Sequence, residues 1–479
     1  MGSLARGTLY FMFVQAGFMA SGYIIHASLG RLLGPAAYGI FGVIISLMTL
    51  VNVMLVAGVP QAGSRFIAIA NETVGAIKKA TLNLQVILSL AVFALYFLLS
   101  PLIAGILGDP ALSGYIRASA FVIPVYALDA LYCGFLNGLR LYGRQAVTLF
   151  LYSIAKVVGT VGLVMLGFAI YGAIAGYLLG PLVGLGIGWY YLRGTGKCQN
   201  SGNFPARKII DFAYPVIIFS FSLLFLMSTD LFLVKMIIGE DVQAGFYTAA
   251  STLSRLPYYI LTGLGFALFP AVSKSVAAKD TAQTGKYIRE SMRYLVLLIL
   301  PVTFIISASS EALIGLFYSD QYAPASYPLA ILVFGLAAFT LFNILATVIN
   351  AAGRPKIPMF IAAALIPVAI GLNSFLIPAY HLAGAAMATT ITGLAGLILV
   401  SVYVLKEFGV LMEIASFTKM LFASLVVFII ILAVPVSGLI LPLWYALLFG
   451  IYLSVLILIK EFNKNELEIL ARILTKRDG

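Results

Sequence analysis

The stretch LGRLLGPAAYGIF at residues 29–41 decides the fold, because a similar stretch, LVKMIIGEDVQAGFY, recurs at residues 233–247. Each copy ends one long apolar segment, turns at a glycine (Gly34 or Gly239) and enters another apolar segment. Glycine permits the positive φ of a tight turn, and Pro35 prevents a helix from running on unbroken. Each copy therefore predicts a helical hairpin, which indicates that one structural unit is used twice.

The composition predicts an integral membrane protein. Of the 479 residues, 62% are apolar and only 10% are charged, whereas a soluble domain carries about 25% charged residues. Apolar stretches of roughly 20 residues recur along the whole chain, so helices rather than a barrel must satisfy the backbone in lipid. The excess of 29 basic over 17 acidic residues is explained by loops at one membrane face and does not call for a nucleic-acid partner.

We predict an all-α fold with fourteen membrane spans. The expected spans are 7–29, 38–63, 80–106, 115–138, 146–167, 170–192, 210–236, 244–271, 292–317, 326–350, 357–377, 383–405, 417–437 and 439–459.

The placement of Lys and Arg predicts the orientation. If the N-terminus is inside, the termini and the even-numbered loops hold 24 of the 29 basic residues, and the odd-numbered loops hold three. Cytoplasmic loops collect Lys and Arg, so both ends of the chain are expected in the cytoplasm. The remaining two, Lys156 and Arg255, fall inside spans.

A second internal match gives the length of the repeat. GLRLYGRQAVTLF at 138–150 is similar to NAAGRPKIPMF at 350–360, so spans 1–6 map onto spans 7–12. Six is even, so the two halves share one orientation, an arrangement found in transporters with a central cleft. The expected divisions are an N-lobe at 1–197, a C-lobe at 198–406, and spans 13 and 14 with a cytoplasmic tail at 407–479.

These features together resemble the polysaccharide-transport branch of the multidrug/oligosaccharidyl-lipid/polysaccharide (MOP) superfamily, the oligosaccharide flippases. The resemblance rests on the doubled six-span lobe, the LGxxGY/F-like turn after span 1, the GR turn after span 4 and the two extra C-terminal spans. It implies a V-shaped pair of lobes in the cell membrane, as in the multidrug and toxin extrusion (MATE) transporters, with a cavity that opens to each face in turn. It also implies a cargo of sugars on a polyprenyl phosphate or diphosphate.

Arg255 is the strongest candidate for cargo binding. A charge near the bilayer centre costs ~2.5–3.5 kcal/mol on insertion scales, so it marks a functional candidate. Pro257 lies two residues beyond Arg255 and is expected to bend the helix, which would turn Arg255 toward the cleft. A guanidinium binds phosphate through two parallel hydrogen bonds. The alternative is a structural salt bridge to Asp230 or Asp129.

Lys156 in span 5 and Asp129 in span 4 lie at similar depths, roughly 15 Å and 13 Å from the cytoplasmic side at about 1.5 Å per residue. The structural interpretation is an ion pair within the lobe. If Lys156 faces the cleft instead, it becomes a second phosphate partner that Asp129 orients.

Other polar residues suggest coupling and sugar binding. Asp230 is a candidate H⁺ or Na⁺ site, although Lys235, one turn beyond, offers it a salt bridge at the membrane rim. His26 is a candidate gate residue because its charge changes near neutral pH, but it could equally be a packing residue. The candidates for sugar contact, which interhelical packing would also explain, are Asn52, Asn343 and Tyr258.

The motif search favours a transporter over an enzyme. We find no phosphate-cradling glycine loop with its lysine, no zinc-ligand spacing and no nucleophile elbow, so we expect no cofactor, metal or catalytic residue. A cation-coupled MATE exporter remains an alternative, but such exporters usually carry an acid in span 1, which is absent here. A lipid II flippase is a second alternative, whose basic residues in spans 1 and 2 are not matched. A membrane glycosyltransferase would need a longer outer loop.

Overall fold

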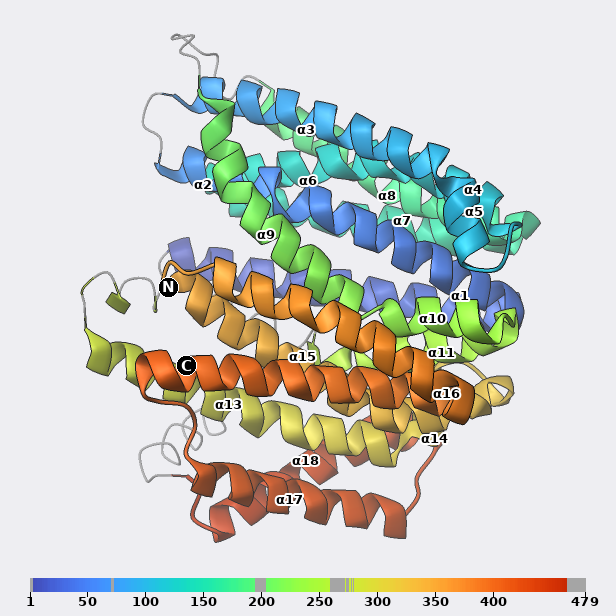
Figure 1. The fold of residues 1–479 in the computed structure, drawn as a ribbon, viewed down its shortest axis with the longest axis vertical. Helices are drawn as coiled ribbons and strands as arrows, with labels where there is room; N and C mark the ends of the chain where they lie inside the picture. The colour runs from blue at the N-terminus through green and yellow to red at the C-terminus, as the bar shows by residue number, and fades with distance from the viewer. Residues whose placement is uncertain are drawn as a thin grey trace.

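The computed structural model describes residues 3–69, 73–193, 204–258 and 280–462 and the single residues 272, 275, 276 and 278, with side chains from residue 17 onward. Every regular element in this part of the chain is a helix, and Figure 1 shows the helices running side by side. In chain order they are α1 (Ser3–Ala57), α2 (Val59–Ile69), α3 (Val74–Leu98), α4 (Ser100–Ile106), α5 (Leu112–Ala120), α6 (Val122–Gly138), α7 (Tyr142–Leu163), the π-helix η1 (Val164–Phe168), α8 (Ala169–Leu192), α9 (Ala206–Leu226), α10 (Thr229–Ile238), α11 (Asp241–Ser254), α13 (Thr281–Ala308), α14 (Ser310–Phe317), the 3-10 helix η2 (Asp320–Ala325), α15 (Ser326–Ala351), α16 (Lys356–Phe408), α17 (Ile414–Ala433), the 3-10 helix η3 (Gly438–Ile440) and α18 (Leu441–Leu458).

The order of the helices agrees with the fourteen expected spans. Ten helical segments of the described chain are long and apolar enough to cross a membrane. Three of them contain the connection between two expected spans, at Gly34 (φ 73°), Gly167 (φ 91°) and His381 (φ 49°). Each connection is therefore reduced to a few residues with left-handed backbone. Expected span 8 is described only as far as residue 258.

The glycines of the repeated stretch have two structural roles, one in the turns and one in helix packing. Gly34 and Gly239 adopt the positive φ that a hairpin turn requires, 73° and 79°. The second glycine of each copy serves packing instead. A Cβ on Gly39 would overlap the backbone of α11, and one on Gly245 would overlap the carbonyl oxygen of Pro35. Equivalent glycines of the two halves thus meet each other, and α1 packs closely against α11.

Several expected spans are not continuous helices. Span 7, expected at 210–236, is divided between α9 and α10, with Met227 and Ser228 outside both. Span 2 is likewise divided at Gly58, where a Cβ would collide with Ile217 of α9. Both breaks occur where the two halves approach each other. Gly58 and Pro60 are local helix breakers at the first break, whereas Met227 and Ser228 contain none, so the second break arises from tertiary packing.

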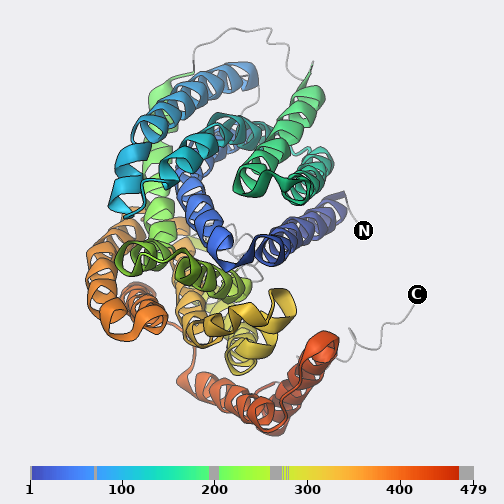
Figure 2. The same ribbon diagram turned by 90° about the vertical axis from the view of Figure 1, so that its right-hand side faces the viewer.

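The helices form two groups and an appended pair. Figures 1 and 2 show α1–α8 grouped together, α10–α16 grouped beside them, and α9 running from one group to the other. α9 packs against α16 of its own half and also against α1 and α2 of the other half, so it joins the two. α17 and α18 pack on α13 at the far edge of the second group, as expected for spans outside the repeat.

Candidate substrate cavity

A cavity of about 360 Å³ lies between the two halves. One wall comes from α1, α6, α7 and α8 of the first half. The other comes from α9, α10 and α11 of the second half and from Ser228, which lies in the break between α9 and α10. Four residues singled out in the sequence line it together: His26, Asn52, Lys156 and Arg255. Residues from three separate spans of the first half and one of the second therefore meet at one site.

The cavity is closed toward the Gly34 turn. The lining residues of α1 nearest that turn, His26 and Gly42, are each eight residues from it, or about 12 Å at 1.5 Å per residue. The farthest, Val56, is twenty-two residues away, or about 33 Å. The cavity therefore extends from the middle of the bundle toward the end where the Lys- and Arg-rich connections lie.

Arg255 is held at the break between α9 and α10. It follows the last residue of α11, and its guanidinium donates hydrogen bonds to the Met227 carbonyl oxygen (2.7 Å) and the Ser228 hydroxyl (3.2 Å). The chain bends at Arg255 itself, two residues before the expected bend at Pro257. Its Nε is buried without a hydrogen-bond acceptor among the described residues. Part of the guanidinium thus stabilises the break, and part retains unused donor capacity beside the cavity.

Lys156 forms no ion pair with Asp129 in the described part of the chain, contrary to the structural interpretation above. Its ammonium lies over the ring of Tyr177, 3.9 Å from the ring centroid. Asp129 is instead buried between α6 and α8, where a Cβ on Gly184 would overlap its Oδ1. The two charges are separated because α8 presents Gly184 to Asp129 of α6 and Gly180 to Lys156 of α7. Each charged residue therefore packs against the backbone of α8 and not against the other.

His26 connects the cavity to the contact between the halves. Its Nδ1 lies 2.8 Å from the Tyr38 hydroxyl, which in turn lies 3.0 Å from the Tyr318 hydroxyl. Tyr322, beside Tyr318, donates a hydrogen bond to the Gly30 carbonyl oxygen (2.8 Å). This aromatic cluster seals the end of the cavity nearest the Gly34 turn.

Asp230 lies outside the cavity and does not pair with Lys235. Its Oδ2 accepts hydrogen bonds from the hydroxyls of Tyr247 (2.7 Å) and Thr389 (2.8 Å). Lys235 forms its salt bridges with two other acids, Asp109 and Asp241. The expected rim salt bridge of Lys235 thus exists with different partners, because the chain brings an acid from the other half next to it.

The remaining candidates divide between the cavity and the core. Asn52 is 5% exposed and lines the cavity, and its Oδ1 has no partner among the described residues. Asn343 on α15 and Tyr258 do not line the cavity. Tyr152 and Tyr177 also line the cavity but were not singled out in the sequence, although Tyr152 precedes Lys156 by one helical turn.

The lining of the cavity is suited to an anion. It contains one Lys, one Arg and one His, and none of its described residues is an Asp or Glu. The hydroxyl groups that accompany them belong to Ser46, Thr49, Ser228, Thr248, Ser251, Thr252, Tyr23, Tyr126, Tyr152 and Tyr177. Charged donors suit phosphate oxygens, and neutral hydroxyls and amides suit sugar hydroxyls.

Known proteins with similar sequence and structure support this description. The chain is 24% identical over 388 residues to the lipid II flippase MurJ of Bacillus subtilis, covering 71% of each chain. It is 24% identical over 387 residues to a putative O-antigen transporter of Shigella flexneri, covering 76% of this chain and 88% of that one. A solved structure of lipid II flippase MurJ in an inward closed conformation matches with a TM-score of 0.75 at 16% identity, covering 98% of this chain and all of that one.

Two family models match the chain. The model described as MatE matches residues 215–375. The model described as polysaccharide biosynthesis protein matches residues 4–276, more than half of the chain. The resemblance seen in the sequence is thereby confirmed: the chain belongs to the polysaccharide biosynthesis protein family of the MOP superfamily.

Proposed function

We propose that this protein is a flippase that moves an oligosaccharide linked to a polyprenyl phosphate or diphosphate from the cytoplasmic to the outer leaflet, for synthesis of a cell-surface glycan. The observation that carries the proposal is the cationic cavity, whose described lining holds Arg255 and Lys156 and no carboxylate. An anionic headgroup would balance these charges, whereas a cationic drug would be repelled by them.

The proposed orientation places both termini in the cytoplasm, with the Gly34 turn at the outer face of the cell membrane. The distribution of Lys and Arg supports it. The cavity is then closed at its outer end, which corresponds to a state that takes up cargo from the cytoplasmic side. The two moving bodies are the lobes 1–197 and 198–406.

In the proposed mechanism, the phosphates of the cargo bind the free donors of Arg255 and the ammonium of Lys156. The sugars contact Asn52 and the hydroxyl groups of the lining, while the polyprenyl tail stays in the bilayer. The lobes then rock against each other, which closes the inner end and opens the outer end. Asp230 and His26 are the residues that we assign to coupling or gating by H⁺ or Na⁺, because both lie in hydrogen-bonded contacts that join separate spans.

Two alternatives differ in the cargo. The MatE match over residues 215–375 favours a cation-coupled multidrug exporter, but the absence of a carboxylate from the described lining disfavours cationic drugs. The similarity to lipid II flippase MurJ favours lipid II, itself a lipid-linked saccharide, so it differs from our proposal only in the sugars.

The test is a flipping assay in proteoliposomes. Purified protein is reconstituted with a polyprenyl-diphosphate oligosaccharide that carries a fluorophore on its sugar, and membrane-impermeant dithionite reports the fraction on the outer leaflet over time. We expect the protein to equilibrate the label between leaflets and the double variant Lys156→Gln, Arg255→Gln to slow this by at least tenfold.

The charge-matched control is Lys356→Gln, Lys406→Gln, which removes two exposed cations outside the cavity. The control is expected to behave like wild type. If wild type fails to move the lipid but drives efflux of a cationic dye down an ion gradient, the exporter is correct and the flippase is not. Selective flipping of lipid II over other lipid-linked sugars would identify the second alternative.

A further inference from the structure

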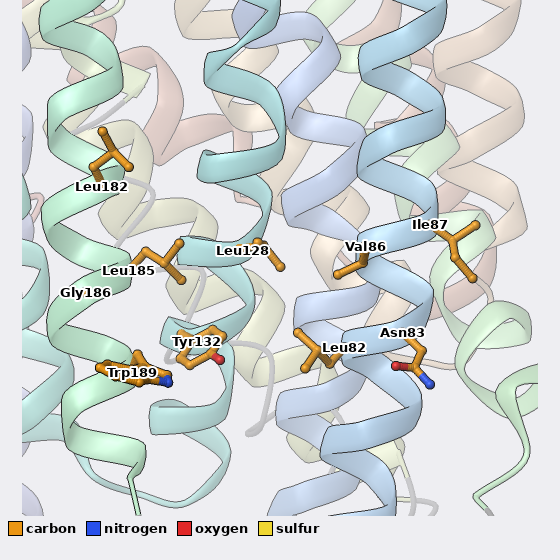
Figure 3. A pocket seen from close by; sticks show the side chains of 10 residues that line it. All are labelled: Leu82, Asn83, Val86, Ile87, Leu128, Tyr132, Leu182, Leu185, Gly186 and Trp189. Carbon is orange, nitrogen blue, oxygen red and sulfur yellow. The ribbon is translucent and has the colours of Figure 1, made fainter.

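A second and larger hollow, of about 660 Å³, lies on the surface of the first half. Its walls come from α3 and α8 and its floor from α6, and all three belong to segments that can cross a membrane. Figure 3 shows that apolar side chains line most of its length, with Leu182 and Leu185 on one wall and Val86 and Ile87 on the other. Its size is within the roughly 300–1,000 Å³ of typical ligand sites.

The polar groups of this groove gather at one end. Figure 3 shows Asn83, Tyr132 and Trp189 at the same level as Leu82, below Leu182, Leu185 and Leu128. Asn83 and Trp189 are on antiparallel helices that both pack against α6, since α3 begins and α8 ends at this side of the bundle. The groove is therefore amphipathic along its axis.

A cation lies one helical turn beyond the polar end on each wall. Lys79 precedes Asn83 by four residues on α3, and Arg193 follows Trp189 by four residues at the end of α8. Residues four apart lie on the same face of a helix, about 6 Å further along it. The Arg193 guanidinium is 3.5 Å from the centre of the Trp189 ring. Within the described chain, neither Lys79 nor Arg193 has a salt bridge, and both are exposed.

We propose that this groove binds an anionic glycerophospholipid. One acyl chain lies along α6 between α3 and α8, and the phosphate lies between Lys79 and Arg193. Hydrophobic walls of a membrane span are covered by lipid, and basic pockets between spans near the membrane surface select anionic headgroups. Charge complementarity at the polar end therefore identifies which lipid the groove prefers.

The groove is separate from the cavity assigned to the cargo. Leu128 and Tyr132 form its floor, whereas the cavity is lined from the same helix by Val122 and Tyr126. Asp129, buried against Gly184, lies between the two. The proposal is thus independent of what the central cavity carries.

The test uses the fluorescence of Trp189. The chain has two tryptophans, so Trp444→Phe leaves Trp189 as the single reporter. Protein depleted of lipid in a non-ionic detergent is titrated with phosphatidylglycerol or phosphatidylcholine whose acyl chains carry bromine, which quenches an indole only at contact. We expect half-maximal quenching by the anionic lipid at a roughly thirtyfold lower mole fraction, as two interfacial cations at about 1 kcal/mol each would give.

Adding Lys79→Gln and Arg193→Gln to this reporter should make the two lipids quench equally, whereas Lys356→Gln with Lys406→Gln should preserve the preference. Equal quenching before these changes would overturn the proposal, since it would indicate apolar contact without headgroup selection. So would an equal loss of preference in the control variant, which would indicate general surface charge. Unlabelled polyprenyl phosphate that displaces the brominated lipid more strongly than unlabelled phosphatidylglycerol would assign the groove to the cargo lipid instead.

Discussion

Arg255 and Lys156 are both half-buried cations, but different contacts hold them. Arg255 donates to the Met227 carbonyl oxygen, which the interrupted helix leaves without an intrahelical donor. Lys156 has a cation–π contact with Tyr177 and no salt bridge in the described chain. Removing Arg255 therefore exposes an unsatisfied backbone group, while removing the charge of Lys156 does not.

The first prediction separates transport from stability. Lys156→Gln should slow flipping at least tenfold and leave the Tm within about 2 °C, because a neutral side chain of similar length is easier to bury than an unpaired ammonium. Arg255→Gln should lower both flipping and Tm, since the hydrogen bond to Met227 is lost at a cost of about 1–3 kcal/mol.

Both quantities can be measured on one preparation, by the flipping assay and by thermal unfolding in detergent. Lys156→Arg serves as the control that keeps the charge, and it should retain most of the transport. If Lys156→Gln lowers the Tm as much as Arg255→Gln does, Lys156 is a packing residue and its assignment to cargo binding fails.

Four of the residues singled out in the sequence line one cavity, but their partners differ from those expected. A charge within an apolar span can be recognised from the sequence because its insertion is costly. Its partner cannot, because it comes from a distant part of the chain. Asp230 accepts from Thr389, 159 residues away, and Lys235 donates to Asp109, 126 residues away. Local spacing suggested a salt bridge between Asp230 and Lys235. In the folded chain, Lys235 forms a salt bridge with the distant Asp109 instead.

α8 carries a glycine at every fourth position, which determines how closely its neighbours approach. The five glycines are Gly172, Gly176, Gly180, Gly184 and Gly188. A Cβ on Gly176 would overlap the backbone of Thr160 on α7, and one on Gly180 would lie 2.9 Å from the Cβ of Lys156. Small residues at this spacing allow membrane helices to pack backbone against backbone. The stripe therefore determines where Lys156 stands in the cavity wall.

The second prediction tests this packing. Gly176→Ala should destabilise the protein by about 1–3 kcal/mol, the usual cost of overpacking, because a backbone cannot move aside as a flexible side chain can. Gly186→Ala is the matched control, since a Cβ on Gly186, on the same helix, meets nothing within 4 Å. Thermal unfolding of the two variants should show a clear loss for Gly176→Ala alone. Equal Tm values would mean that α7 and α8 do not depend on this close contact.

Helix existence was predictable from the sequence, and helix continuity was not. Long apolar segments predicted the spans, and Gly34 and Gly239 predicted the turns between them. The break at Met227 and Ser228 has no proline or glycine to signal it. It occurs where Arg255 binds the freed carbonyl oxygen, so the break and its stabilising residue lie in different spans and can be recognised only together.

For the whole molecule, polar contacts between the halves concentrate at the end of the Gly34 turn. Lys235 is buried between Asp109 of the first half (2.8 Å) and Asp241 of its own half (2.5 Å). Arg31 of the first half donates to the carbonyl oxygen of Tyr318 (2.8 Å). The internal repeat predicted two similar lobes, but it could not predict which loops would touch, since that depends on how far the lobes are tilted.

Lys235 is arranged so that its own ion pairs add little to the cost of opening this end. If the halves separate there, Lys235 keeps Asp241, and Asp109, which is already 21% exposed, becomes hydrated. No charge is then left buried and unpaired, which is the costly outcome of breaking a buried ion pair. Asp109 therefore contributes to the closed state more than to the stability of either half.

The third prediction is that Asp109→Asn shifts the protein toward a state open at this end, with little change in Tm. Spin labels at Ala111→Cys and Gln321→Cys, both exposed, report the separation of the halves by pulsed electron spin resonance after Cys133 and Cys198 are replaced by alanine. We expect the long-distance population to rise roughly threefold to tenfold, as the loss of about 1 kcal/mol from one partly exposed ion pair would give. Glu311→Gln, which neutralises an exposed acid at the same end, should leave the distances unchanged.

Asp241→Asn should instead lower the Tm, because Lys235 would lose the partner that it keeps in both states. If Asp241→Asn opens this end while Asp109→Asn does not, the contact between the halves depends on the shape of the α10–α11 turn and not on the charge that crosses it.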